Sequence, residues 1–467
     1  MQVVRKTMSR CPKCAKEVGG AIVVSGGRAY IHRECPEHGA YQYLLSEHGE
    51  DYADLDRFYS EVYETSSPGR KMHTWITSTL QCQQRCPYCT VDCAREAEDI
   101  LWEDMNWNDL LDVLNRFKRG KLSFSGGEPT LHPNMLDFFR EADRRDISVQ
   151  LATNGLLLTS KDYCRELKEN KVNEVRLSLE SVTADGAAKL GLENHVASKL
   201  QAIQNLCDEE ISVLLSPTIF KGVNDDQLYH ILEHTKDKPG IHAVSAEGFS
   251  WNGSGVRMPP EMMISPDEMM DILFRHYCKC GRSELFALQK LAYAIMNVAG
   301  FDLCLKSEFM VFLRRSGELR PITDFVHARR MGRMLDLWRR IIPRQRWVRG
   351  LLLLPVLAGG LTLRTLPLLA VLLRLVLANS RRLDVHKYPS EVVVVALNTN
   401  CCTLNADSIV VPHCISGYIF KRGGVVHWEE GVATVLLEKE EENCRSGFWH
   451  RMREHQWRGP DAEKRGG

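Results

Sequence analysis

Cys82-Gln-Gln-Arg-Cys86-Pro-Tyr88-Cys89 places three cysteines on one short loop, directly after a strand-like run at 73–80. Three thiolates at this C-x₃-C-x₂-C spacing can bind three irons of a four-iron cubane and leave the fourth iron without a protein ligand. A second interpretation recruits Cys93 as a fourth thiolate and makes the loop a structural zinc site. The third is a loop of free thiols. We favour the iron cluster because of a second motif, about forty residues further along the chain.

The next strand-like run ends in a turn, Gly126-Gly127-Glu128-Pro129. Glycines let the backbone approach a ligand closely, and Glu128 supplies a carboxylate or carbonyl acceptor for a cationic amine. Alone, such a turn could be any strand-to-helix corner. Because it comes after the three-cysteine loop, at the end of the neighbouring strand, it predicts a site for an amine-bearing cofactor beside the cluster.

Between residues 72 and 250, β-rich runs alternate with amphipathic stretches, which indicates repeated β–α units and a parallel sheet. Six such units form three quarters of a TIM-like barrel, so loops at the strand C-termini should share one face. The strands are expected at 73–80, 122–125, 147–152, 172–179, 212–219 and 241–247, and the helices at 107–117, 134–145, 161–169, 197–207 and 226–235.

From Met72 to Glu247 the chain resembles the radical S-adenosylmethionine (SAM) superfamily. The resemblance implies a [4Fe–4S] cluster on Cys82, Cys86 and Cys89 that cleaves SAM to a 5′-deoxyadenosyl radical, with electrons from a reductant such as flavodoxin or ferredoxin. Protein groups then position cofactor and substrate. The implied SAM contacts are Tyr88 to adenine, the Gly126, Gly127, Glu128 and Pro129 turn to the methionine amine, Thr153 and Ser178 to methionine or ribose, and Glu180 to ribose. Ordinary polarity at strand ends is the alternative for Thr153 and Ser178.

Two ligand pairs stand near the N-terminus, Cys11-x₂-Cys14 and Cys35-x₂-His38. Three thiolates and one imidazole suit tetrahedral zinc, and a module this small needs such a staple to fold. A rubredoxin-like iron that passes electrons inward is the functional alternative, and unmetallated cysteines are the third.

The composition excludes several function classes. The 467 residues contain 60 basic and 60 acidic side chains, so no global field favours nucleic acid. Sixteen cysteines without the apolar core of a secretory signal peptide indicate metal or redox chemistry in a reducing compartment rather than disulfides. We therefore expect a cytoplasmic protein.

We predict an α/β protein: a partial (βα)₆ TIM-like barrel with a small N-terminal metal-binding module and a mixed α+β C-terminal region. The expected divisions are 1–65 (metal-binding module), 72–250 (barrel), 251–345 (connecting or substrate region), 346–380 (hydrophobic, basic-flanked segment) and 381–467 (β-rich region and polar tail), with a linker at 66–71. A hairpin is expected from 309–313 and 319–325, turning at Arg315-Ser316-Gly317.

The segment from Trp347 to Leu377 is strongly apolar, but arginines, prolines and Gly359-Gly360 interrupt it. A buried arginine at mid-bilayer is costly, so two short helices meeting at the glycines fit better than one span. They could lie in the membrane interface and make the protein peripheral to the membrane, or form a buried helical hairpin. The arginines expected at lipid headgroups are Arg339, Arg340, Arg344, Arg346, Arg381 and Arg382.

A narrower resemblance is to the tetraether lipid synthase group, whose older label is pterin methylase. It rests on the N-terminal pairs, the cysteine loop, Pro217-Thr218-x₃-Gly222-Val223-Asn224-Asp225 and Gly317-Glu318-Leu319-x-Pro321-Ile322-Thr323. It implies coupling or alkyl modification of a membrane lipid, and an auxiliary iron–sulfur cluster. The linker at 66–71 replaces one of the group's cysteine motifs, and only Cys304 and Cys414 match its C-terminal cysteines. Cys278, Cys280, Cys401, Cys402 and Cys444 stay unassigned.

The sequence leaves the substrate open. A membrane lipid is favoured by the 347–377 segment. Methylation of a pterin-like heterocycle and maturation of a ribosomal peptide are the alternatives, and a non-enzymatic electron carrier would leave the Gly-Gly-Glu-Pro turn unexplained.

Overall fold

The computed structural model describes residues 1–63, 73–91, 93, 102–118, 120–300, 303–305, 307–341, 345–365, 389–399 and 416–429. The predicted linker at 66–71 lies outside these residues. So do Arg344, Arg381, Arg382 and the cysteines from Cys401 onward.

The N-terminal module is a four-stranded antiparallel sheet followed by one helix. Its strands run over Gln2–Arg10 (β1), Glu17–Ser25 (β2), Arg28–Cys35 (β3) and Gly39–Ser46 (β4), in that spatial order. Helix α1 covers Gly49–Tyr63. The β1–β2 and β3–β4 connections lie at the same end of the sheet, which brings the two predicted metal-ligand pairs together.

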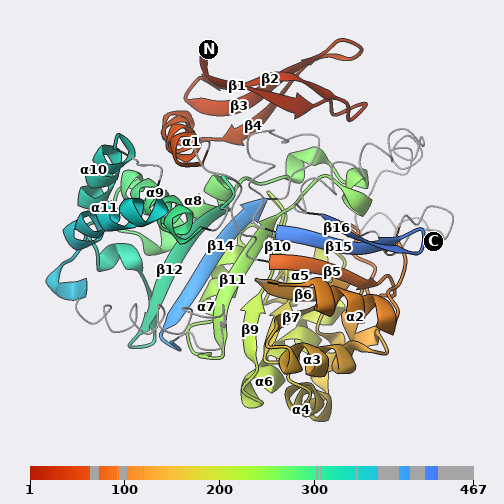
Figure 1. The fold of residues 1–467 in the computed structure, drawn as a ribbon. Helices are drawn as coiled ribbons and strands as arrows, with labels where there is room; N and C mark the ends of the chain where they lie inside the picture. Colours follow the sequence, from red (N-terminus) through yellow and green to blue (C-terminus); the bar gives the residue numbers. More distant parts are fainter. Residues whose placement is uncertain are drawn as a thin grey trace.

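A larger sheet forms the body of the protein (Figure 1). Its first strands are His73–Thr79 (β5), Lys121–Gly126 (β6), Ser148–Thr153 (β7), Glu174–Leu177 (β8), Ser212–Leu215 (β9), Thr218–Ile219 (β10) and Ile241–Gly248 (β11). They occur in the predicted runs, except that the run at 212–219 is broken at Ser216-Pro217 into β9 and β10. The predicted helices between them are Trp107–Arg116 (α2), Met135–Arg144 (α3), Lys161–Glu169 (α4), Val196–Asp208 (α6) and Gln227–Glu233 (α7), and a short helix at Ala184–Ala188 (α5) was not expected. The α/β class and the β–α alternation are confirmed.

The C-terminal region does not make a sheet of its own. Val392–Thr399 (β14) pairs in parallel with β11, and Ser416–Arg422 (β15) pairs in parallel with β5 at the opposite edge. In the described part of the chain the sheet order is β13-β12-β14-β11-β9-β8-β7-β6-β5-β15-β16, where β16 is Val425–Glu429. The run of four valines at the start of β14 is typical of a parallel strand buried on both faces.

The predicted hairpin is confirmed and continues this sheet. Ser307–Arg315 (β12) and Glu318–Pro321 (β13) are antiparallel, and β12 also pairs with β14. Ser316 and Gly317 both have positive φ, 52° and 75°, as a two-residue type I′ turn requires.

A helical layer covers the β12 end of the sheet, on the left of Figure 1. Its helices are Pro266–Tyr277 (α8), Arg282–Ala299 (α9), Ala328–Arg339 (α10) and Arg346–Gly359 (α11). Phe58 and Tyr59 of α1 share one hydrophobic cluster with Tyr293, Trp338 and Val356 from these helices. The N-terminal module is therefore anchored to the rest of the chain through α1.

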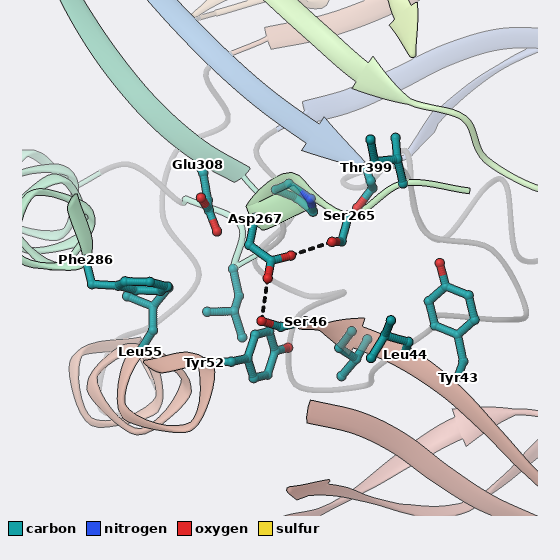
Figure 2. A pocket seen from close by; sticks show the side chains of 14 residues that line it. Tyr43, Leu44, Ser46, Tyr52, Leu55, Ser265, Asp267, Phe286, Glu308 and Thr399 are labelled. Atoms are coloured by element: carbon teal, nitrogen blue, oxygen red, sulfur yellow. Dashed lines mark hydrogen bonds between the residues drawn. The ribbon is translucent and has the colours of Figure 1, made fainter. Parts of the chain in front are cut away.

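A second anchor joins β4 to α8. Ser46 Oγ donates to Asp267 Oδ2 over 2.5 Å, and the His48 ring lies 2.7 Å from Asp271 Oδ2. Figure 2 shows Asp267 between Ser46 and Ser265, with Glu308 of β12 pointing into the same small cavity of about 30 Å³. That is room for little more than a water molecule, so this contact is structural.

The hydrophobic segment begins as predicted. Helix α11 ends at Gly359, where Gly359 and Gly360 pack so closely on Met334 and Met331 of α10 that a Cβ would lie 2.4 Å or less from either sulfur. Of the expected second helix only the start is described, where Leu363–Thr365 forms a short 3₁₀ helix, and the rest lies outside the described residues. No helix of the described chain combines the length and apolarity that crossing a bilayer requires.

Candidate active site

The Gly-Gly-Glu-Pro turn is built around the carboxylate of Glu128, which is completely buried. Its Oε1 accepts from Thr130 N (3.1 Å), Thr130 Oγ1 (2.6 Å) and Thr153 Oγ1 (2.6 Å), and its Oε2 accepts from Asn154 N (2.8 Å). Both oxygens thus join the end of β6 to the end of β7. The Glu128 side chain therefore shapes the cradle, with both of its oxygens bonded within the protein.

The two glycines of the turn are required by neighbouring backbone. Gly126 has φ +139°, and a Cβ on it would lie 2.3 Å from Thr79 O. A Cβ on Gly127 would lie 2.3 Å from Gln81 O. The glycines do permit a close approach, as expected. The group that approaches them in this structure is the backbone at the end of β5, from which the cysteine loop starts. The glycines lock the turn and the loop together.

The cysteine loop starts at the end of β5 and faces this cradle. Asn154 Nδ2 lies 4.0 Å from Cys82 Sγ, so one residue touches both the loop and, through its N–H, Glu128. Burial raises the pKa of Cys82 and of Cys86, and the Glu128 and Glu180 carboxylates add to the effect. Thiols in this setting ionise when a cation is present to bind them, which suits an iron cluster.

The zinc interpretation of this loop is not supported by its geometry. Among the described residues, Cys11, Cys14, Cys35 and His38 form the one set of three or more His, Cys, Asp or Glu side chains arranged to hold a single ion. Cys82, Cys86, Cys89 and Cys93 are not such a set. A cubane instead spreads its three thiolates over three irons, so the donor set fits that group.

Tyr88, Ser178 and Glu180 meet on the other side of the loop, with a partner that the sequence analysis missed. Lys199 of α6 donates to Ser178 Oγ and to Glu180 Oε2, each over 3.0 Å, and the Lys199–Glu180 pair is buried. The Tyr88 ring packs edge-on against Phe220 at 4.9 Å. Burial and the nearby Glu180 carboxylate raise the pKa of Tyr88, which keeps its hydroxyl protonated.

The structure therefore brings the sequence-predicted cofactor residues to one face, with Thr153 and Pro129 buried beside them. Missed residues carry weak sequence signals. Lys199 occupies an apolar-periodic position of α6, and Asn224 of the Gly222–Asp225 motif donates to Glu180 O over 3.0 Å. Asn252 comes shortly after β11. Its side-chain Nδ2 and Oδ1 are both buried without a hydrogen-bond partner in the described chain. Ser254 N, nearby, donates to Cys89 O over 3.0 Å.

The N-terminal ligand set is assembled as predicted. The four ligand atoms lie within 4.8 Å of one another, with His38 Nδ1 3.7 Å from Cys11 Sγ and 3.5 Å from Cys35 Sγ. A zinc tetrahedron with the usual bond lengths has edges of about 3.6 Å. Burial raises the pKa of Cys14 to about 11. It acts in the same direction on Cys35, but hydrogen bonds, led by that from His38, outweigh it and bring the Cys35 pKa to about 7. The set fits one thiophilic metal.

The side chains that line the interior of the sheet next to the cofactor residues are polar. Arg176 of β8 donates to Glu247 Oε1 of β11 over 2.8 Å and lies over the Trp75 ring at 5.0 Å. Deeper still, Lys121 pairs with Glu174, and Gln150 donates to the same carboxylate. Burial lowers the pKa of the neighbouring His73 to about 3, which keeps that ring neutral.

The auxiliary cluster stays a prediction. Cys278 and Cys280 form a close pair after α8 and Cys304 precedes β12, whereas Cys414 and the other candidates lie outside the described residues.

Family models of known proteins match both the barrel region and the N-terminal module of this chain. Residues 76–235 match the family model of the radical SAM superfamily, and residues 3–47 match that of the HMPTM N-terminal zinc ribbon domain. The chain is 25% identical over 262 residues to the 7,8-dihydro-6-hydroxymethylpterin dimethyltransferase of Methanocaldococcus jannaschii, which covers 51% of each chain. It is 27% identical over 171 residues to a GTP 3′,8-cyclase of Helicobacter pylori, covering 35% of this chain and 51% of that one.

The chain thus spans about half the length of the curated relatives it matches. Among solved structures, SuiB of Streptococcus suis bound to its precursor peptide SuiA overlaps 48% of this chain and 49% of its own, with 14% identity and a TM-score of 0.36.

Proposed function

Because this chain is an enzyme of the radical SAM superfamily, we propose that it cleaves SAM at a [4Fe–4S] cluster on Cys82, Cys86 and Cys89 and modifies a pterin-like heterocycle. When bound, the cluster supplies the electron that splits SAM. Together, the cluster and SAM would supply the means to remove a hydrogen atom from an unactivated C–H bond of the substrate. The observation that carries the proposal is Asn154, which touches Cys82 with its side chain and Glu128 with its backbone.

The chain's own residues hold and orient the cofactor. Glu128 fixes the turn that receives the methionine end, and Thr153 and Asn154 hold Glu128 in place. The Lys199–Glu180 pair positions a carboxylate beside Tyr88 and Ser178, where a ribose hydroxyl and the adenine ring would bind. All of these groups are buried or half-buried, which keeps water away from a reactive intermediate.

The choice of a heterocycle rests on two supports. One is the 25% identity over 262 residues to a pterin dimethyltransferase, together with the match of residues 3–47 to the HMPTM N-terminal zinc ribbon domain. The other is the polar lining beneath the cofactor site, because an alkyl chain there would take accessible polar groups out of water without offering them a hydrogen bond.

A membrane lipid is the second candidate substrate, favoured by one exposed surface. Trp347, Leu351, Leu354 and Leu361 are 70%, 56%, 57% and 45% exposed; with Ala358 they form what we call the α11 apolar face. The opposite side of α11 is fixed, since Leu353 and Val356 are buried and Arg349 Nη1 donates to Asn297 Oδ1 over 2.6 Å.

Basic residues flank this face in part. Arg330, Arg333, Arg340 and Arg364 are exposed. Arg339, expected at lipid headgroups, is instead turned toward the acidic side chains Asp54, Glu61 and Asp336, with nearest contacts of 3.6–3.9 Å. An apolar face with a basic rim suits the membrane interface.

The experiment that tests the proposal uses anaerobically reconstituted full-length protein with dithionite, SAM and 6-hydroxymethyl-7,8-dihydropterin deuterated on carbon. Deuterium in 5′-deoxyadenosine is the expected result. If deuterium enters only from deuterated lipid, the lipid candidate replaces the pterin one. If no 5′-deoxyadenosine forms with any substrate, the radical SAM assignment of the site is wrong.

A further inference from the structure

Arg176 and Glu247 form an ion pair in the interior of the sheet that the cofactor assignment does not use. Arg176 Nη2 donates to Glu247 Oε1 (2.8 Å) and to Ser245 Oγ (3.1 Å), and Arg176 Nε donates to Ser216 Oγ (3.0 Å). The Trp75 ring supports the guanidinium at 5.0 Å. Three strands (β5, β8 and β11) and Ser216, the residue after β9, therefore fix one side of this pair.

The other side of the pair is open. Within the described chain, Arg176 Nη1 and Glu247 Oε2 make no hydrogen bond. The Arg176 side chain is 10% exposed and the Glu247 side chain is 25% exposed. Asn398 and Ser245 also donate to Glu247, but only to Oε1, at 3.4 and 3.3 Å. The pair thus presents one donor and one acceptor side by side to accessible space.

This open edge lies next to the cofactor site. Ser178 comes directly after β8 and two residues after Arg176, and its N–H still donates to Thr153 O of β7 (3.1 Å). The alternation of an extended chain therefore puts both side chains on the same side, about 6.6 Å apart. Glu247 is the penultimate residue of β11, at the same end of the parallel sheet. A molecule bound here would lie between the polar interior and the group bound at Ser178.

We infer that Arg176 and Glu247 anchor the substrate by the lactam or amidine edge of a planar nitrogen heterocycle. A ring N–H donates to Glu247 Oε2, and the adjacent carbonyl oxygen or ring nitrogen accepts from Arg176 Nη1. This inference rests on the proposed function and names the residues that select its substrate. An anionic ligand would be repelled by the Glu247 carboxylate. An alkyl chain would desolvate Arg176 Nη1 and Glu247 Oε2 without offering either atom a hydrogen bond.

The test measures binding of 6-hydroxymethyl-7,8-dihydropterin to reconstituted full-length protein by the fluorescence of the pterin. Glu247→Gln keeps the shape of the side chain and removes its charge. Arg176→Lys keeps the charge and removes the planar guanidinium, including the Nη1 donor. Each should weaken pterin binding at least tenfold. A pterin methylated at N3 lacks the ring donor, so it should bind the wild type and E247Q equally weakly.

Controls separate this inference from the proposed function. Glu308→Gln alters a carboxyl on β12 outside the pair and should leave pterin binding unchanged. SAM cleavage without pterin should be the same in E247Q as in the wild type. Equal pterin affinity of E247Q and the wild type would overturn the anchor while leaving the radical chemistry intact. A wild type that does not bind the pterin would overturn the heterocycle class, and absence of SAM cleavage would overturn the proposed function instead.

Discussion

The hydroxyl of Thr153 donates to Glu128 Oε1 over 2.6 Å, across the ends of two neighbouring parallel strands. This bond connects two residues that the sequence separates by 25 positions. It means that Glu128 organises the cofactor cradle from within, and that Thr153 contributes by holding Glu128 as well as by any contact of its own with a ligand.

Thr153→Val keeps the side-chain shape and removes the hydrogen bond. A hydrogen bond to a charged group contributes about 1.5–3 kcal/mol, so SAM binding should weaken roughly tenfold or more while iron content is retained. Equilibrium dialysis with labelled SAM measures this. The matched control is Thr159→Val, because Thr159 is exposed and its hydroxyl donates only to Leu156 O within its own turn. Equal losses in both variants would count against the cradle.

Replacing Cys82, Cys86 and Cys89 together by alanine should abolish both the [4Fe–4S] absorbance and the formation of 5′-deoxyadenosine. Cys93→Ala should preserve both, because the cubane assignment does not need a fourth thiolate. Iron analysis and product chromatography on the same samples give the answer. Loss of the cluster in the Cys93 variant would restore the four-cysteine alternative.

The N-terminal ligand set should hold one metal independently of the barrel cluster. Cys11→Ser with Cys14→Ser should remove one equivalent of zinc or iron from the full-length protein and leave the barrel iron in place. The module should also lose stability, because binding of a structural metal contributes to folding. Cys207→Ser is the control, and elemental analysis is the measurement. An unchanged metal content in the double variant would refute the site.

Glu308 makes stability depend on pH. Burial raises its pKa to about 8, with the Asp267 charge adding to the effect. Between pH 4.5 and 8 the folded chain keeps this proton and the unfolded chain releases it, so stability falls as pH rises. At 1.36 kcal/mol per pKa unit the loss is at most about 5 kcal/mol.

Glu308→Gln mimics the protonated carboxyl and should remove this loss. The difference in free energy of unfolding between E308Q and the wild type should grow from pH 4.5 to 8 and then level off. Denaturant titrations at several pH values measure it, with the exposed Glu318→Gln as the control. A difference that does not vary with pH would show that Glu308 ionises normally.

The α11 apolar face gives the lipid candidate its own test. Leu351→Glu with Leu354→Glu should abolish co-sedimentation with anionic vesicles, and wild-type binding should weaken at high salt because the arginines are screened. Val425→Glu places a charge on an equally exposed apolar residue at the other edge of the sheet and should have no effect. If the wild type ignores vesicles, the lipid candidate is dropped.

The sequence by itself determined the local features of this protein. Hydrophobic periodicity located β5 to β11 and five helices, and Arg315-Ser316-Gly317 specified its hairpin turn, because these patterns depend on residues close together in the chain. Cysteine spacing predicted two metal sites for the same reason: each ligand pair or loop is contiguous.

Only the tertiary structure decided how distant segments meet. Nothing in Val392–Thr399 or Ser416–Arg422 states that these strands join opposite edges of the barrel sheet, because pairing depends on which edges the rest of the fold leaves open. The same holds for Lys199 beside Glu180 and for Arg176 beside Glu247. Each pair joins separate elements, and its chemistry exists because folding removes the two side chains from water together.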